Sequence, residues 1–171
     1  MALFDLTRIY GKPYTVDQGS SPGVPIATSP LESTEKPSRS TVAQCYEAIE
    51  KDLTDAINSN ALPKTNEVGY VNLWAAKALQ VRVYMTKGEW SKALSVAEDI
   101  ISNSSYKLWE PSEYVAAWSK SDANHSKEIM FEISINNNTD WTDREGIAYL
   151  YADKALSLIH ISEPTRPISI S

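Results

Sequence analysis

The 171-residue sequence is poor in the residues that build covalent and metal-centred sites, with one cysteine and two histidines. A single cysteine forms no internal disulfide and excludes a zinc site made of several thiolates. Cys45 falls on the apolar face of a predicted helix, which favours a buried small side chain over a reactive thiol. His125 stands alone in a polar segment, and we expect it to be a solvated loop residue.

Long apolar runs and clustered positive charge are also absent. No apolar run approaches the ~18 residues of a membrane-spanning helix. The first stretch, MALFDLTRIYG, carries an acid early and has no apolar core, so it does not read as a signal peptide. If the sequence is a complete chain, the lack of a signal peptide indicates a cytoplasmic protein. If it is a fragment, the lack of a signal peptide says nothing about localisation. The 16 basic residues form no cluster and face 22 acidic ones, which excludes the charge pattern of a nucleic-acid-binding protein.

Catalytic signatures are missing as well. The sequence contains no GxGxxG, Walker A, HExxH or G-x-S-x-G motif. Glycosidase chemistry needs two carboxylates across a cleft, whereas pairs such as Asp52 and Asp55 lie on the polar face of a predicted helix. The stretch NNNTDWTDREG lacks the glycine and terminal glutamate of an EF-hand loop. We therefore predict a protein that is not an enzyme and that needs no metal or cofactor.

Helical periodicity is the main positive signal. Apolar residues at three- and four-residue spacing predict helices over 1–10 and 41–58, a helical hairpin over 75–101 and a short helix from Pro111. Residues 11–40 are rich in proline and glycine, which predicts a long extended loop and not a pair of strands. Residues 128–135, EIMFEISI, alternate between apolar and polar side chains and predict one strand.

The same periodicity predicts which side chains face inward. These are Leu3, Leu6 and Ile9 in the first helix, Trp90, Ala93, Leu94, Ala97, Ile100 and Ile101 in the second half of the hairpin, and Tyr114, Ala117 and Trp118 in the short helix. The predicted helix caps are Ser38 or Ser40 before the 41–58 helix, Asn72 before the hairpin and Gly88 at its joint.

An aromatic and polar segment follows the predicted strand. Aromatic rings can stack on the apolar C–H faces of sugars, while amide, carboxylate and guanidinium groups bind the hydroxyls. We predict a ligand site from the residues of this segment that have those side chains, namely Trp141, Tyr149, Tyr151, Asn138, Asp140 and Arg144. An ordinary loop with core tyrosines is the alternative interpretation.

The hairpin resembles a tetratricopeptide unit, because Tyr84, Gly88, Trp90, Ala93 and Leu94 fall at the mutual offsets of that repeat. The order of segments is more specific. Residues 3–135 resemble the N-terminal half of the SusD/RagB family through the succession FDLTRIYGKPY, a Pro-rich loop, STVAQCYEAIEKDLTDAI, AAKALQVRVYMTKGEWSKALSVAEDIISNSSYKL, SEYVAAW and KEIMFEISI. The sequence departs from the family pattern at Gln80, Val81 and Met130.

This resemblance implies an all-α fold of tetratricopeptide-like hairpins with a long Pro/Gly loop and one short strand. It also implies a non-catalytic lipoprotein on the outer face of the outer membrane in Bacteroidota. Such a protein binds a glycan or other nutrient and caps a SusC-like TonB-dependent transporter, and its lipid anchor would lie outside this sequence, so Cys45 is not the anchor. A tetratricopeptide-type adaptor and a glycoside hydrolase fragment are the alternatives.

The last segment differs in character from the rest. LSLIHISEPTR, residues 156–166, has no clear periodicity and resembles the conceptual translation of a transposon-end sequencing adapter. We therefore expect a partial SusD-like helical domain, truncated at both ends, over residues 1–155 and an artefactual tail over residues 156–171. His160 carries no functional weight for this reason.

Overall fold

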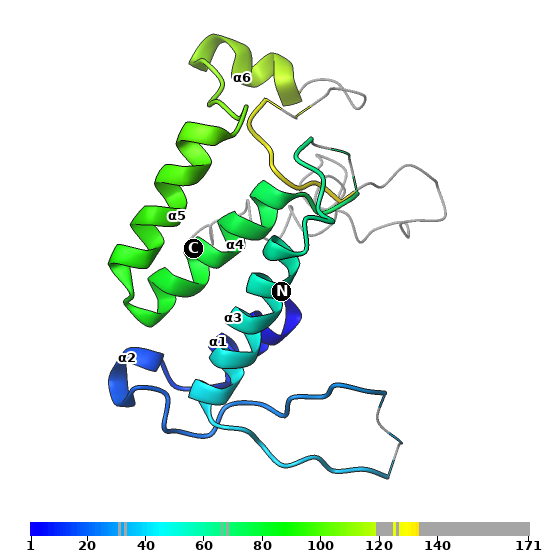
Figure 1. The fold of residues 1–171 in the computed structure, drawn as a ribbon, viewed down its shortest axis with the longest axis vertical. Coiled ribbons are helices and arrows are strands. Elements are labelled where there is room, and N and C mark those ends of the chain that lie inside the picture. Colours follow the sequence, from blue (N-terminus) through cyan, green and yellow to red (C-terminus); the bar gives the residue numbers. More distant parts are fainter. Residues whose placement is uncertain are drawn as a thin grey trace, which may run out of the picture. The chain divides into compact units, whose positions relative to one another are not determined.

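The computed structural model describes residues 1–30, 32, 34–65, 67, 69–118, 125 and 127–133. The chain divides into two compact units, residues 1–132 and 133–171, and every element below belongs to the first. Its helices are α1 (Ala2–Tyr10), α2 (Tyr14–Asp17), α3 (Val42–Asn58), α4 (Leu73–Lys87), α5 (Trp90–Asn103) and α6 (Pro111–Trp118) (Figure 1). The predicted all-α class is confirmed.

Helix α4 is the central element of this unit. It packs against α3 and against α5, while α1 packs on α3 and α2 contacts α4 (Figure 1). A helix with apolar residues on most sides suits such a position between neighbours. The predicted helical hairpin is therefore present as α4 and α5. In the described residues no helix combines the length and apolarity needed to cross a membrane.

Local sequence signals set the ends of these helices. The side chain of Asn72 caps α4 by accepting a hydrogen bond from the Ala75 amide at 2.9 Å, as predicted. Gly88 ends α4 in the left-handed region at φ 80°, also as predicted. The predicted Ser38 or Ser40 cap of α3 is wrong, because Thr41 occupies that position and forms a reciprocal capping box with Gln44.

The core lies where α1, α3 and α4 meet. Its fully buried members are Phe4, Val42, Tyr46, Ile49 and Val83. The Tyr46 ring receives the Phe4 ring edge-on at 6.2 Å and the Tyr14 ring edge-on at 5.4 Å. Because Tyr14 belongs to α2, these ring contacts join the start of the Pro/Gly loop to the helical frame.

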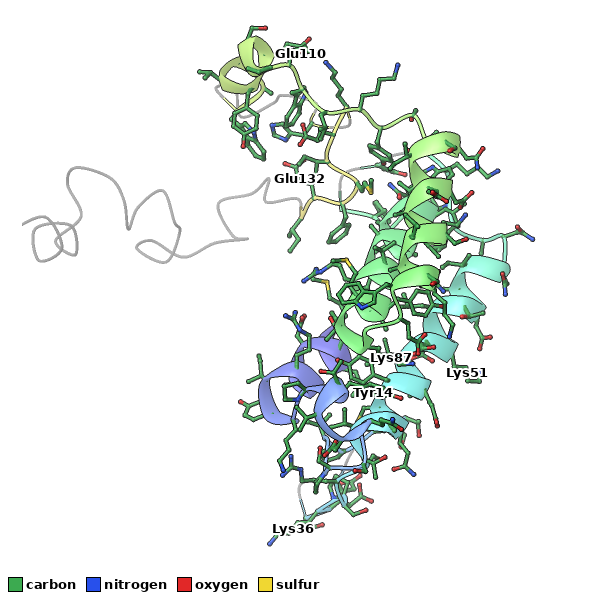
Figure 2. All side chains as sticks on the ribbon, turned by 90° about the vertical axis from the view of Figure 1, so that its left-hand side faces the viewer. Tyr14, Lys36, Lys51, Lys87, Glu110 and Glu132 are labelled. Carbon is green, nitrogen blue, oxygen red and sulfur yellow. The ribbon has the colours of Figure 1, made fainter. Side chains whose placement is uncertain are left out.

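Lys87 completes the joint between the helices. Its ammonium forms ion pairs with Glu50 of α3 and Glu89, and it lies 5.2 Å from the centre of the Tyr14 ring. Burial lowers the pKa of Lys87, but hydrogen bonds to the two carboxylates raise it by more, so the pKa lies above its usual value. Figure 2 labels Lys87 and Tyr14 at the level where the hairpin joint meets α2.

The Pro/Gly loop is more ordered at its base than predicted. Pro22 and Thr41 form an antiparallel bridge, and the Gly23 amide donates to the Ser40 carbonyl at 2.7 Å. The guanidinium of Arg39 donates to the carbonyls of Gly23, Pro22 and Tyr10 at 2.5, 3.2 and 3.0 Å. The two ends of the loop are therefore paired, which an excess of proline and glycine does not reveal.

Several predicted inward faces are wrong. In α1 the buried residues are Phe4 and Thr7, whereas the predicted Leu6 and Ile9 are exposed. In α5 only Ala93 and Ile100 are buried, and the exposed members of the predicted stripe are Trp90, Leu94 and Ile101. Each of these helices packs against a neighbour on a narrower strip than its apolar face, so periodicity overestimates what is covered.

The strand predicted over 128–135 is not formed in residues 128–133, the part of it that the structure describes. This stretch makes separate hydrogen bonds instead of a ladder. The Glu132 carbonyl accepts from the Gly69 amide at 2.9 Å, and the Met130 carbonyl accepts from the Asn72 side chain at 2.9 Å. Alternation of apolar residues supplies one face of a strand but not a partner strand, and among the described residues no segment pairs with it.

Candidate functional site

A cluster of three aromatic residues, hereafter the ring cluster, surrounds helix α6. It consists of Trp109, just before the helix, and of Tyr114 and Trp118 on the helix itself. The Trp109 ring centre lies 6.0 Å from that of Tyr114 and 5.9 Å from that of Trp118, both in edge-to-face geometry. Tyr114 and Trp118 follow one another at i and i+4, so they share one helix face.

The ring cluster is open to solvent, contrary to the prediction that Tyr114 and Trp118 face inward. Tyr114 is 53% exposed and Trp118 is 51% exposed, while Trp109 is partly buried. Of the α6 residues only Ala117 is not exposed, because α6 forms no extensive packing with another helix.

His125 lies under the ring cluster and corrects the prediction of a solvated loop residue. It is 8% exposed, and its ring stacks on Trp118 with centres 4.6 Å apart and planes 24° apart. Nδ1 lies 2.9 and 3.0 Å from the carboxylate oxygens of Glu132, and Nε2 lies 2.9 Å from the Ala117 carbonyl oxygen. Apolar periodicity cannot indicate such burial, because His125 is polar. It is covered by the Trp118 ring and paired with Glu132, seven residues later in the chain.

The protonation of His125 follows from these contacts. Both ring nitrogens face oxygen acceptors, and only the doubly protonated imidazolium donates at both positions. The hydrogen bond to the Glu132 carboxylate raises the pKa of His125 above its usual value, and the bond to Ala117 adds to this effect against the opposing effect of burial. Below this raised pKa His125 is an imidazolium that donates to Glu132 and to the Ala117 carbonyl near the end of α6.

Other polar contacts hold the ring cluster in place. The backbone amide of Trp109 donates to the Glu128 carboxylate at 2.8 Å, and Lys127 forms an ion pair with Glu113 of α6. This pairing with Lys127 lowers the pKa of Glu113. Figure 2 labels Glu110, beside the start of α6, and Glu132, the partner of His125. The rings thus lie on a small polar framework built by Glu113, His125, Lys127, Glu128 and Glu132.

Two apolar grooves lie elsewhere among the described residues of this unit. One, of about 460 Å³, lies along α3 and α4 and includes Leu53, Leu79, Arg82 and Phe131 in its lining. The second, of about 340 Å³, lies beside the end of α5 and includes Ile100, Ile101, Leu108 and Met130. Both offer mainly apolar surface, which suits apolar side chains better than a hydroxyl-rich ligand.

The ligand-site residues predicted from sequence, Trp141, Tyr149, Tyr151, Asn138, Asp140 and Arg144, all lie outside the described residues. The predicted boundary near Ala155 and the tail 156–171 lie outside them too. Cys45 is buried and donates a weak hydrogen bond to the Val24 carbonyl at 3.4 Å, consistent with a packing role. Among the described residues, no group of three acidic, histidine or cysteine side chains is placed to hold a metal ion.

Sequence reasoning missed the ring cluster as a site. The i, i+4 spacing of Tyr114 and Trp118 was a usable signal, but periodicity alone does not tell an inward face from an exposed one. Chemically, the arrangement offers half-exposed aromatic faces next to carboxylates.

Comparisons with known proteins identify the chain's relatives. Residues 1–85 match a SusD-like family described as starch-binding and associating with the outer membrane. No protein of curated function matches the sequence.

Solved structures extend this likeness beyond residue 85. A SusD superfamily protein from Bacteroides thetaiotaomicron is 46% identical, with a TM-score of 0.70, over 79% of this chain and 29% of that one. A Bacteroides vulgatus protein whose suggested role is sugar binding is 44% identical, with a TM-score of 0.78, over 90% of this chain and 34% of that one. A SusD superfamily protein from the same species is 36% identical, with a TM-score of 0.68, over 80% of this chain and 31% of that one. The chain spans about a third of the length of these relatives.

Proposed function

The chain belongs to the SusD-like family, and from this premise we propose that the whole protein binds a glycan without cleaving it, as part of a nutrient uptake system of the outer membrane. The observation that carries the proposal is the match of residues 1–85 to a family described as starch-binding and associated with that membrane. The half-exposed rings around α6 support it, because aromatic faces are a common surface for sugar rings.

We further propose a SusC-like TonB-dependent transporter as the protein partner, with a lipid anchor holding the protein at the cell surface. This part of the proposal rests on the family alone. It predicts that a transporter gene neighbours the gene for the full-length protein and that the two proteins co-purify from outer membranes. Full-length copies with no such neighbour would favour the adaptor function instead.

A tetratricopeptide-type adaptor is the second candidate function. The observation in its favour is the apolar groove along α3 and α4, which would accept apolar side chains of a protein segment. An adaptor of this kind would bind peptides and would not bind sugars.

The direct test is a binding and turnover measurement on the full-length protein. Immobilised neutral oligosaccharides are presented on an optical biosensor, and the same oligosaccharides are incubated with the protein and analysed for released sugar. We expect binding of at least one oligosaccharide and no cleavage. Sugar release would overturn the non-enzymatic role, and the absence of any binding would overturn the glycan-binding function.

A further inference from the structure

The ring cluster brings three aromatic side chains into mutual contact at the surface. Tyrosine and tryptophan bury large apolar areas, and such residues dominate cores and interfaces. Here Tyr114 and Trp118 remain half exposed on one face of α6, with Trp109 against both rings. The three rings therefore present an aromatic surface that the described residues leave accessible.

This surface is held in a fixed arrangement before any ligand arrives. The imidazole of His125 covers one side of the Trp118 ring, and Glu128 fixes the backbone of Trp109 by a hydrogen bond of 2.8 Å. Glu113, which directly precedes Tyr114 on α6, is paired with Lys127. Because little side-chain freedom remains to be lost on binding, the surface is preorganised for a ligand that stacks on it.

We propose that the ring cluster formed by Trp109, Tyr114 and Trp118 is a contact site for an uncharged glycan. This inference rests on the proposed glycan-binding function and adds the place of contact and the class of ligand. The apolar C–H faces of the sugar rings stack on the indole and phenol rings. The neighbouring carboxylates and backbone carbonyls accept hydrogen bonds from the sugar hydroxyls.

The charges around the rings favour an uncharged over an anionic glycan. Among the described residues of this segment carboxylates outnumber cationic groups, the acidic residues being Glu110, Glu113, Glu128 and Glu132 and the basic ones Lys107, Lys127 and His125. Of these cationic groups, Lys127 is already paired with Glu113, and His125 is already paired with Glu132. A uronic acid or sialic acid polymer would bring further negative charge to this surface, and to a chain of net charge −6.

The test uses the full-length protein and four biosensor-immobilised probes. These are maltoheptaose, xylohexaose and mannohexaose as neutral glycans and hexagalacturonate as the anionic counterpart. The variants are Trp118→Leu, which removes the aromatic ring but keeps an apolar side chain, and Trp118→Phe, which restores an aromatic ring. Tyr114→Leu is a second loss-of-ring variant that leaves the stack on His125 untouched. Trp90→Leu is the matched control, because Trp90 is 65% exposed but lies on α5.

We expect Trp118→Leu and Tyr114→Leu to weaken binding of the neutral ligand by roughly ten-fold or more, the usual effect of removing a central aromatic contact. Trp118→Phe should recover most of the affinity, and Trp90→Leu should bind like the parent chain. Circular dichroism of each variant establishes that the helices are retained.

Three results would overturn the inference while leaving the proposed function in place. These are unchanged affinity in both loss-of-ring variants, an equal loss in Trp90→Leu, and binding of hexagalacturonate in preference to every neutral probe. If the parent chain binds none of the four probes, the glycan-binding function itself fails, and the site fails with it.

Discussion

The side-chain amide of Asn72 donates a hydrogen bond of 2.9 Å to the hydroxyl of Tyr106, 34 residues later in the chain. The same amide donates to the Met130 carbonyl at 2.9 Å, and the side-chain oxygen caps α4 through the Ala75 amide. Asn72 is 1% exposed, so these bonds are made out of reach of solvent. One side chain thereby joins the start of α4, the chain that follows α5 and the segment beneath the ring cluster.

Two substitutions separate the roles of Asn72. Asn72→Ala removes the cap and leaves the Tyr106 hydroxyl and the Met130 carbonyl without their donor, so we expect a loss of roughly 2–4 kcal/mol in the free energy of unfolding. Asn72→Ser keeps a capping oxygen and loses only the distant bonds, with an expected loss of about 1–3 kcal/mol. Urea denaturation followed by circular dichroism measures both. Equal losses would show that the cap contributes nothing.

The partly buried ion pairs of Lys87 are expected to matter more than exposed ones. Lys87→Met leaves Glu50 without its cation, while Glu89 keeps its pair with Lys92. We expect a loss of about 1–3 kcal/mol in unfolding free energy, reduced from the fully buried case by partial solvent access.

The matched control for Lys87 is Lys51→Met, because Lys51 pairs with Asp55 on the exposed face of α3. We expect no measurable change in the urea midpoint of that variant. A second substitution, Glu50→Gln in the Lys87→Met chain, should recover part of the loss by removing the unpaired charge. An equal effect of the two lysine substitutions would contradict the special role of Lys87.

Gly19 and Gly88 both lie in the left-handed region, at φ 76° and 80°, but they differ in the space around them. A Cβ at Gly88 would meet Thr15 Cγ2 at 3.4 Å, so Gly88→Ala should cost about 1 kcal/mol for backbone strain alone. A Cβ at Gly19 would lie 2.7 Å from the Ala43 amide nitrogen, at the first turn of α3. We expect Gly19→Ala to be more destabilising by roughly 1–3 kcal/mol. Thermal unfolding of the two variants measures both losses of stability. Comparable losses would argue against a steric difference between the two positions.

The pairing of His125 predicts a pH dependence of the ring cluster. The pKa of His125 in the folded chain is raised above 6.5, mainly by the hydrogen bond to Glu132. The stabilisation that this bond provides is therefore complete below pH 6.5 and is lost as the pH rises through the folded-state pKa. We expect the near-ultraviolet circular dichroism of the tryptophans to change over this range, because the stacking contact between His125 and Trp118 becomes less fixed.

The control for this titration is His125→Phe, which keeps a ring against Trp118 but carries no titrating proton. Because the chain has two histidines, His160→Gln is introduced in both backgrounds to remove the other titration. A flat profile in the His125→Phe chain is expected. The same step in that chain would assign the titration to another group.

The candidate site could be predicted only in part. The sequence indicated a short helix from Pro111 with Tyr114 and Trp118 on one face, and the structure has this helix. It could not indicate that the face is open, because exposure depends on whether another helix packs there. The contacts of His125 with Glu132 and Ala117 join positions with no common helical or strand period, so no periodic pattern in the sequence predicted them. The residues predicted as ligand contacts between 138 and 151 stay a prediction.

The fold was predictable where its determinants are local. Asn72 and Gly88 set the ends of α4 through a side-chain cap and a positive φ, and both act within a few residues of the chain. Thr41 was missed as the cap of α3 because several polar residues precede that helix, and only the geometry of its box with Gln44 selects one of them.

By itself, then, the sequence determined the helices, their joint at Gly88 and the family of the chain, because helical spacing and turn residues act over short separations. Only the tertiary structure decided which apolar faces are covered, why residues 128–133 form no strand, and how Trp109, Tyr114 and Trp118 come together above His125. Some of those outcomes depend on contacts between residues far apart in the chain, such as Asn72 and Met130, and others on contacts over a few residues that follow no helical or strand period, such as His125 and Glu132. The free energy of such contacts belongs to the packed arrangement and not to any one segment.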